Sequence, residues 1–311
     1  MGKIMAARHK LREVIGTRPR QSTGAVRHEG EKAVVSRLTG AFVRAVLVMV
    51  LVSTPSVLLP GVGNDGKEMV ALVALFAGFL AFIEYNSAYP GLIEFRDAPP
   101  FNRVRFMMLF ATIFLLTVIA RGETQPTTLS IFVRSVGGLI GTAMDFPYSP
   151  VRLATLMLSD GAPDGNIAKV RIATGMSYLI SLISLSVFVI LLKFYGWPSR
   201  TGAFNVWVNL PTFDPTAGGD VVDRLDRDAR INIALGFLLP FLIPAVVKLG
   251  SSGLDPETFG APQTLIWTVA AWAFLPASLF MRGIAMGRIA DMIREKRRLN
   301  GLTGPEGYLP A

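Results

Sequence analysis

Residues 174–192 read TGMSYLISLISLSVFVILL, a run of 19 residues without Asp, Glu, Lys, Arg or His. A helix that crosses the hydrocarbon core of a bilayer needs roughly 20 mostly apolar residues, with about 17–25 the usual range. Five other windows approach this length and composition, and we predict that each of the six is a transmembrane helix. The other windows are residues 42–59, 69–88, 105–120, 231–247 and 264–281.

The composition of the whole chain leads to the same fold class. Of its 311 residues, 51% are hydrophobic and 17% are charged, whereas an ordinary soluble domain is about 25% charged. A soluble protein with six such windows would have little polar surface to cover them. We therefore predict an all-α integral membrane protein, a bundle of six transmembrane helices with one or two interfacial helices. Several windows are short, so flanking Lys and Arg side chains are expected to reach outward from the helix ends.

Residues 130–144, SIFVRSVGGLIGTAM, form a seventh apolar segment that differs from the six windows. The segment is too short for a span and carries Arg134 near its centre, so we interpret it as interfacial or re-entrant. Gly137 and Gly141 are four residues apart, a spacing that permits close packing of two helices. The same glycines are equally compatible with a flexible loop.

The distribution of Lys and Arg predicts the orientation of the chain. With a cytoplasmic N-terminus and six spans, 24 of the 31 Lys and Arg residues lie on the cytoplasmic side, as the positive-inside rule favours. We therefore expect both termini in the cytoplasm, and the inner membrane of a bacterium fits best. Residues 1–40 are expected to be a basic, largely disordered tail, too long for a signal peptide. Residues 41–282 are then the membrane domain, and residues 283–311 are a basic cytoplasmic segment.

The net charge of +9 comes mainly from the two terminal segments. Residues 1–40 contain no aromatic side chain on which a nucleic-acid base could stack. We therefore expect no nucleic-acid partner. The expected partners are anionic lipid headgroups of the bilayer and another membrane protein.

Residues 84–105, EYNSAYPGLIEFRDAPPFNRVR, are the most informative polar segment of the chain. This segment joins the second and third spans on the expected cytoplasmic side, and its three prolines make the backbone stiff. Glu84 lies in the last turns of the second span, where an uncompensated charge is costly. We therefore expect Glu84 to pair with Arg103 or Arg105 at the start of the third span.

Two interpretations of this segment are open. It is either a rigid, ion-paired cap that locks the hairpin of the second and third spans, or a docking surface or small-ligand site. The candidate functional residues are Glu84, Tyr85, Asn86, Glu94, Arg96, Asp97, Asn102, Arg103 and Arg105.

Several classes of chemistry lack the residues they need. The chain has no Cys, and its two His residues, His9 and His28, both lie in the N-terminal tail. This excludes disulfides, thiolate chemistry and Cys/His zinc sites, and it leaves the membrane bundle without a His ligand for haem. No nucleophile elbow, phosphate-binding loop or zinc-protease helix motif occurs in the sequence. We therefore expect no cofactor and no metal, and the sequence favours a protein that is not an enzyme.

Three functions remain. The first is a non-catalytic accessory, assembly or scaffold subunit that docks partners through residues 84–105. The second is a transporter or channel for a small or lipidic solute, with Pro-containing fifth and sixth spans and a membrane-depth cavity lined by Ser and Thr. The third is an enzyme acting on lipid, with Glu94, Arg96, Asp97 and Arg103 near headgroup level, which requires its acids to converge on one point.

Overall fold

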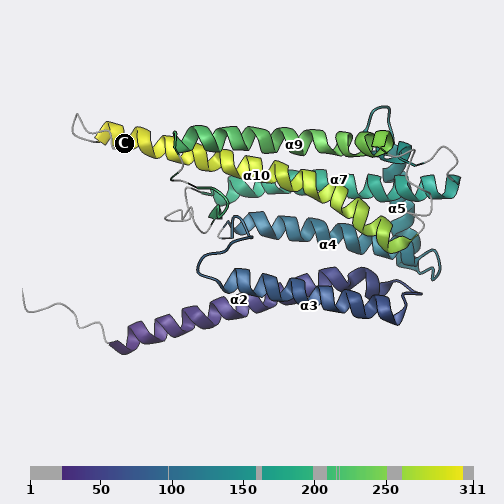
Figure 1. Ribbon diagram of the computed structural model, residues 1–311, viewed down its shortest axis with the longest axis horizontal. Coiled ribbons are helices and arrows are strands. Elements are labelled where there is room, and N and C mark those ends of the chain that lie inside the picture. The colour runs from purple at the N-terminus through teal and green to yellow at the C-terminus, as the bar shows by residue number, and fades with distance from the viewer. Residues whose placement is uncertain are drawn as a thin grey trace, which may run out of the picture.

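The computed structural model describes residues 23–96, 98–158, 163–198, 209–214, 216, 218–250 and 261–303. These residues form eight helices and no strand. Figure 1 shows the helices, most of which run side by side along one direction. In chain order they are α2 (Thr23–Leu58), α3 (Asn64–Asn86), α4 (Pro99–Arg121), α5 (Thr128–Met144), α6 (Pro150–Leu156), α7 (Asp164–Tyr195), α9 (Val221–Gly250) and α10 (Pro262–Thr303).

Six of these helices are long and apolar enough to cross a membrane, as predicted: α2, α3, α4, α7, α9 and α10. The helices α7, α9 and α10 extend well beyond the apolar windows, to 32, 30 and 42 residues. At the far end of α10, Arg294 pairs with Asp226 of α9, and Arg297 lies 2.6 Å from Asp220, just before α9. These contacts hold the polar continuation of α10 against the polar start of α9.

The bundle has two distinct ends (Figure 1). The helix α2 begins and α10 ends at the same end, which also carries the connection between α3 and α4, and we call it the tail end. The opposite end is crossed by α5 and is called the α5 end. The two ends of the described chain therefore lie on one side of the bundle, as six spans require.

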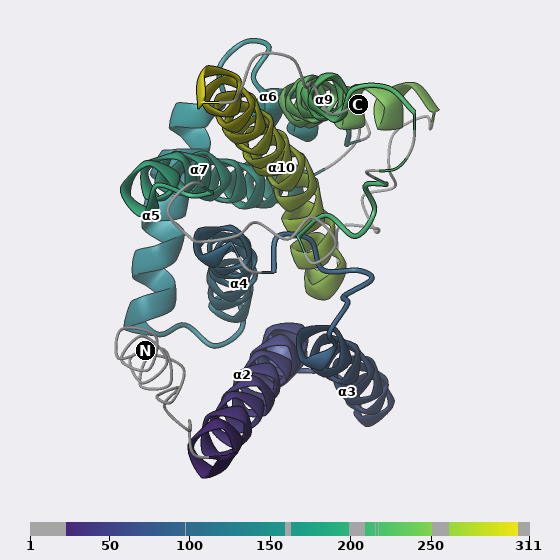
Figure 2. The same cartoon turned by 90° about the vertical axis from the view of Figure 1, so that its left-hand side faces the viewer.

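The helix α10 is central and α3 is peripheral. The helix α10 contacts α4, α7 and α9, and half of its most apolar window is buried. In contrast, α3 packs against α2 and no other described helix, and only 11% of its window is buried. Figure 2 shows the α2–α3 hairpin standing to one side of the remaining helices. Gly78 of α3 permits close contact, because a Cβ atom there would lie 2.6 Å from Met49 Cγ of α2.

The helix α5 lies across the end of the bundle (Figures 1 and 2) and is one continuous helix of 17 residues. Gly141 packs directly on α7, because a Cβ atom there would lie 2.9 Å from the backbone oxygen of Arg171. Gly175 of α7 packs against the same glycine, because a Cβ atom at Gly175 would lie 2.6 Å from Gly141 Cα. The Gly137–Gly141 pattern therefore serves helix packing and does not mark a flexible loop.

The buried apolar side chains form two clusters. One lies toward the α5 end and includes Ile113, Leu116 and Ile266. The other lies toward the tail end and includes Phe95 and Phe101, so the connection between α3 and α4 contributes directly to the core. This connection, which we call the α3–α4 loop, comprises residues 87–98.

Candidate functional site

Glu84 binds the backbone of the α3–α4 loop. Its Oε2 atom accepts hydrogen bonds from the backbone N–H groups of Gly91, Leu92 and Ile93, at 2.9, 2.9 and 3.2 Å. The expectation that Glu84 pairs with Arg103 or Arg105 is wrong. The chain turns back so that three consecutive N–H groups point at one position, and such a concave group of donors binds a carboxylate well.

Arg96 caps the end of α3. Its Nη1 atom donates to the backbone oxygens of Ser87, at 2.5 Å, and Glu84, at 3.3 Å. Carbonyl groups in the last turn of a helix have no partner within the helix, and a basic side chain satisfies them and opposes the negative end of the helix dipole. Glu84 and Arg96 thus fold the loop back on the helix that precedes it.

Glu94 joins the loop to distant parts of the chain. Its Oε2 accepts from Nε of Arg282 at 2.6 Å, its Oε1 accepts from Nη2 of Arg282 at 2.9 Å, and Oε1 also accepts from Thr212 Oγ1 at 2.7 Å. The side chains of Glu94 and Arg282 are 15% and 25% exposed. Burial raises the pKa of Glu94, but the hydrogen bonds from Arg282 and Thr212 outweigh it and hold the pKa below its usual value.

Phe95 anchors the loop in the core, and the sequence reasoning missed it. Its side chain is fully buried, with its ring centroid 4.4 Å from that of Phe101 and 5.9 Å from that of Trp197. Its backbone N–H donates to the oxygen of Asn209 at 2.7 Å, and its φ angle is +52°. A positive φ is costly for a bulky residue. The surrounding contacts hold it there, among them the bonds from Asn102 Nδ2 to the backbone oxygens of Glu94 and Phe95.

The three aromatic–arginine contacts of the segment are also structural. The guanidinium of Arg105 lies over the rings of Phe101, at 5.1 Å, and Phe274, at 5.5 Å, while that of Arg44 lies 4.6 Å from the centre of the Tyr85 ring. Cations stack on aromatic faces in this way. These contacts connect α4 with α10 and α2 with α3.

Three candidate residues remain: Asn86, Asp97 and Arg103. Asn86 is the last residue of α3, and Asp97 lies outside the described residues. Arg103 is exposed and lines a groove of about 470 Å³ between α4 and α7, together with apolar residues such as Met107 and Ile183.

The two described acids of residues 84–105 therefore bind separate partners and do not surround a common point. Glu84 binds backbone of its own loop, whereas Glu94 binds Arg282 and Thr212. Within the part of the chain that the structure covers, no group of three or more His, Cys, Asp or Glu side chains could hold a metal ion. The geometry is that of a rigid brace with an exposed tip, where Tyr89 and Leu92 are 75% and 71% exposed.

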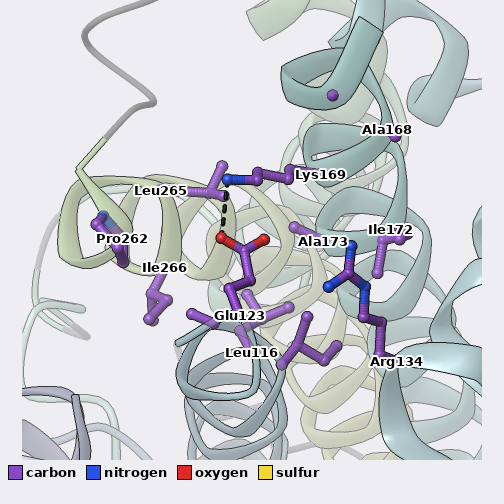
Figure 3. A pocket seen from close by; sticks show the side chains of 13 residues that line it. Leu116, Glu123, Arg134, Ala168, Lys169, Ile172, Ala173, Pro262, Leu265 and Ile266 are labelled. Carbon is purple, nitrogen blue, oxygen red and sulfur yellow. Dashed lines mark ion pairs between the residues drawn. The ribbon is translucent and has the colours of Figure 1, made fainter. Parts of the chain in front are cut away.

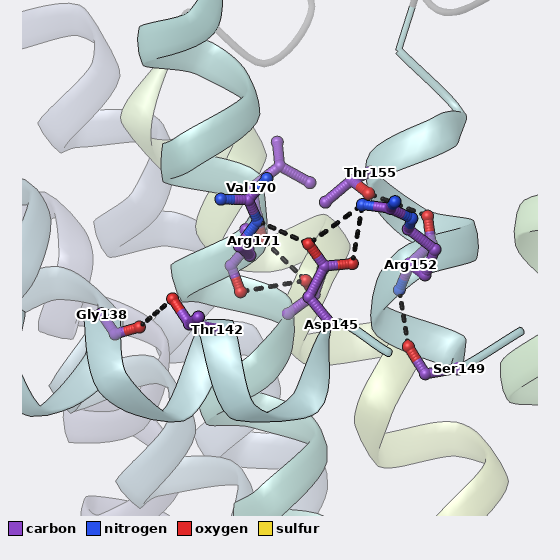
Figure 4. A network of polar contacts seen from close by, with 9 residues as sticks. Gly138, Thr142, Asp145, Ser149, Arg152, Thr155, Val170 and Arg171 are labelled. Atoms are coloured by element: carbon purple, nitrogen blue, oxygen red, sulfur yellow. Dashed lines mark hydrogen bonds and ion pairs between the residues drawn. The ribbon is translucent and has the colours of Figure 1, made fainter. Parts of the chain in front are cut away.

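A second polar network lies at the α5 end (Figure 4). The nearly buried carboxylate of Asp145 lies 3.3 Å from Arg152 Nη1 and 2.8 Å from Arg171 Nε. Asp145 follows α5, Arg152 belongs to α6 and Arg171 to α7. This network joins three helices, and the sequence reasoning did not identify it.

A cavity of about 160 Å³ lies near this network, where α4, α5, α7 and α10 meet (Figure 3). Its inner wall is apolar and includes Leu116 and Ile266, and its charged lining residues are Glu123, Arg134 and Lys169. Lys169 Nζ lies 2.8 Å from Glu123 Oε2. The sequence offered one indication of this cavity. Arg134 and Lys169 are among the few Lys and Arg residues that the predicted topology places on the side opposite the basic termini.

Comparisons of the chain with protein-family models, with curated proteins and with solved structures found no match. The functional argument therefore depends on the geometry of the described residues.

Proposed function

We propose that this chain is a non-catalytic accessory, assembly or scaffold subunit of a membrane complex, which docks a membrane-protein partner through residues 84–105. The observation that carries the proposal is the bond set of Glu84 to Gly91, Leu92 and Ile93. It fixes the backbone of the loop tip while Tyr89 and Leu92 remain exposed. An exposed apolar pair on an ordered backbone supports the docking of a partner at this loop.

Two physical effects favour this surface as a contact for a partner. A loop that is already ordered loses little conformational entropy when it binds. Tyrosine is enriched among the residues that contribute most to protein–protein affinity. Tyr89 and Leu92 together offer an aromatic and an aliphatic anchor beside the polar backbone of the loop.

The hydroxyl groups inside the bundle give little support to a solute pathway. Thr112, Thr117 and Ser177 donate to backbone oxygens of their own helices, at 2.8, 2.6 and 2.8 Å. A hydroxyl that donates to its own helix offers less to a passing solute. The lipid-enzyme hypothesis gains no support, because Glu94 binds Thr212 and Arg282 and its second acid, Asp97, lies outside the described residues.

The orientation belongs to the same proposal. We infer that the tail end faces the cytoplasm and that the bilayer is a bacterial inner membrane, because 24 of the 31 Lys and Arg residues then lie inside. Anionic headgroups at that face would attract the basic terminal segments. The partner would therefore approach the α3–α4 loop from the cytoplasmic side.

Site-specific photocrosslinking in native membranes tests the proposed docking surface. A photoreactive amino acid is placed at Tyr89 or Leu92, and the control position is Tyr148, which is 87% exposed at the α5 end. We expect a discrete adduct with one membrane protein from positions 89 and 92 and none from position 148. Absence of that adduct, or the same adduct from all three positions, rejects the docking surface.

A further inference from the structure

The cavity at the α5 end is arranged with a polar mouth and an apolar interior. Glu123 lies just beyond the end of α4, Lys169 lies in the second turn of α7, and Arg134 belongs to α5, which crosses this end of the bundle. Leu116 and Ala173 lie one to two turns deeper along α4 and α7. The cavity is therefore polar at the level where a membrane surface would be and apolar toward the middle of the bundle. This is the polarity of an amphiphile that stands with its head at the membrane surface.

The charged groups of the mouth leave one positive charge uncompensated. Glu123 and Lys169 form an ion pair of 2.8 Å and offset each other. Arg134 forms no ion pair or hydrogen bond through its side chain with any residue that the structure describes. Figure 3 shows its guanidinium at the side of the cavity, next to Ile172. The mouth thus presents a free guanidinium, which binds carboxylates through paired hydrogen bonds.

Two helix N-termini add to the positive potential of the mouth. Gly165 in the first turn of α7 and Pro262 at the start of α10 both line the cavity. The N-terminus of a helix carries a partial positive charge and favours an anion nearby. Asp164 precedes Gly165 and is exposed, but it does not line the cavity.

We propose that this cavity binds a single-chain alkyl carboxylate, with its carboxylate on Arg134 and its chain against Leu116, Ile119 and Ile266. The size of the cavity supports one short chain. An apolar cavity of about 150 Å³ holds a ligand the size of benzene, so this cavity of about 160 Å³ takes about six carbon atoms of an alkyl chain while the carboxylate end stands at the mouth. Two acyl chains of a phospholipid do not fit in that space, which favours a ligand with a single chain.

Competition in a lipid nanodisc tests the ligand class. The purified protein in phosphatidylcholine nanodiscs is labelled with a photoreactive diazirine analogue of octanoic acid, and the labelled residues are located by mass spectrometry. We expect labels on cavity-lining segments of α4, α7 and α10. Octanoate should halve the labelling at a concentration at least tenfold lower than octanol does. Octanol has the same chain length but no charge. Equal competition by octanol rejects the role of the carboxylate.

Two variants test the site itself. Arg134→Gln should weaken octanoate binding at least tenfold and leave octanol binding unchanged, and Arg134→Lys should restore part of the difference. Gly165→Phe should reduce the binding of both, because a Cβ atom at Gly165 meets no atom within 4 Å and a side chain there has room to enter the mouth. Lys67→Gln removes an exposed positive charge from the same end of the bundle and is the matched control.

The thermal midpoint of each variant shows whether it is folded. Because Arg134 is exposed, its replacement should not disturb the core. Labelling that spreads over the lipid-facing helix surfaces overturns the proposal. So does octanoate affinity that is the same in Arg134→Gln and Lys67→Gln. Neither result bears on the docking of a partner at the opposite end of the bundle.

Discussion

Glu94 and Arg282 are 188 positions apart in the sequence, and their side chains form a two-point ion pair with N–O distances of 2.6 and 2.9 Å. The pair joins the α3–α4 loop to the central helix α10. Thr212 adds a third hydrogen bond to the same carboxylate. The α3–α4 loop is therefore held from two sides, by Glu84 at its tip and by Glu94 at its base.

Replacing Glu94 with Gln should lower the stability of the protein. Arg282 would lose its charged partner in a largely buried position, and a hydrogen bond to a charged group contributes about 1.5–3 kcal/mol. Thermal unfolding in detergent measures the effect. Glu295→Gln is the control, because its pair with Arg298 is exposed and such pairs contribute about 0–1 kcal/mol. Equal shifts in the two variants would contradict a structural role for the Glu94–Arg282 pair.

The contribution of Glu94 should depend on pH. Its pKa lies below the ordinary value of 4.5, because the hydrogen bonds from Arg282 and Thr212 outweigh the effect of burial. A carboxyl group with a lowered folded-state pKa stabilises the protein above the unfolded pKa, and this stabilisation is lost as pH falls through the folded pKa.

The measurement is the difference in thermal midpoint between the wild type and Glu94→Gln as a function of pH. The difference should be constant above about pH 5 and should shrink as the pH falls below 4.5. The pKa of Asp220 is also lowered, by the hydrogen bond from Arg297. Because Asp220 is present in both proteins, its contribution cancels in the difference between their thermal midpoints. A difference that does not change with pH would show that ionised Glu94 is not the stabilising species.

Glu84→Ala should loosen the tip of the α3–α4 loop without unfolding the bundle. The amides of Gly91, Leu92 and Ile93 lose their acceptor and should exchange with deuterium faster. Arg103→Gln tests the pairing that the sequence suggested, and it should leave these amides unchanged. Hydrogen-exchange mass spectrometry measures the exchange rates of these amides in both variants. Faster exchange in Arg103→Gln would indicate that Arg103 supports the loop after all.

The contact of α5 with α7 can be tested with two neighbouring glycines. Gly141→Ala should destabilise the protein by about 1–3 kcal/mol, because the new Cβ would lie 2.9 Å from the backbone oxygen of Arg171. At Gly138 a Cβ meets no atom within 4 Å, so Gly138→Ala should be neutral or stabilise the helix by up to about 1 kcal/mol. Similar thermal midpoints for the two variants would contradict close packing at Gly141.

The six spans were predictable because hydropathy is a property of consecutive residues. A window such as 174–192 shows its membrane character without knowledge of its neighbours. The three prolines of residues 84–105 predict a stiff backbone, and this stays a prediction. The Gly137–Gly141 spacing indicated a helix contact, but the sequence alone could not separate this interpretation from a flexible loop.

The partners of individual charges were not predictable, because they depend on how the chain turns in three dimensions. Glu84 was expected to pair with a nearby Arg, but the turn at residues 87–91 presents backbone N–H groups to its carboxylate instead. The partner of Glu94 comes from the last helix, and no local pattern indicates such a pair. The cavity at the α5 end arises where four helices meet, so its lining residues share no motif.

Native mass spectrometry of the protein extracted from its own membrane in a mild detergent tests the docking role most directly. We expect the wild type to carry one discrete protein partner in addition to its own 33.7 kDa, and the double variant Tyr89→Ser, Leu92→Ser to lose that partner while keeping its thermal midpoint. A wild type that is found only at 33.7 kDa, or a partner retained in full by the double variant, would show that the α3–α4 loop is not a docking surface.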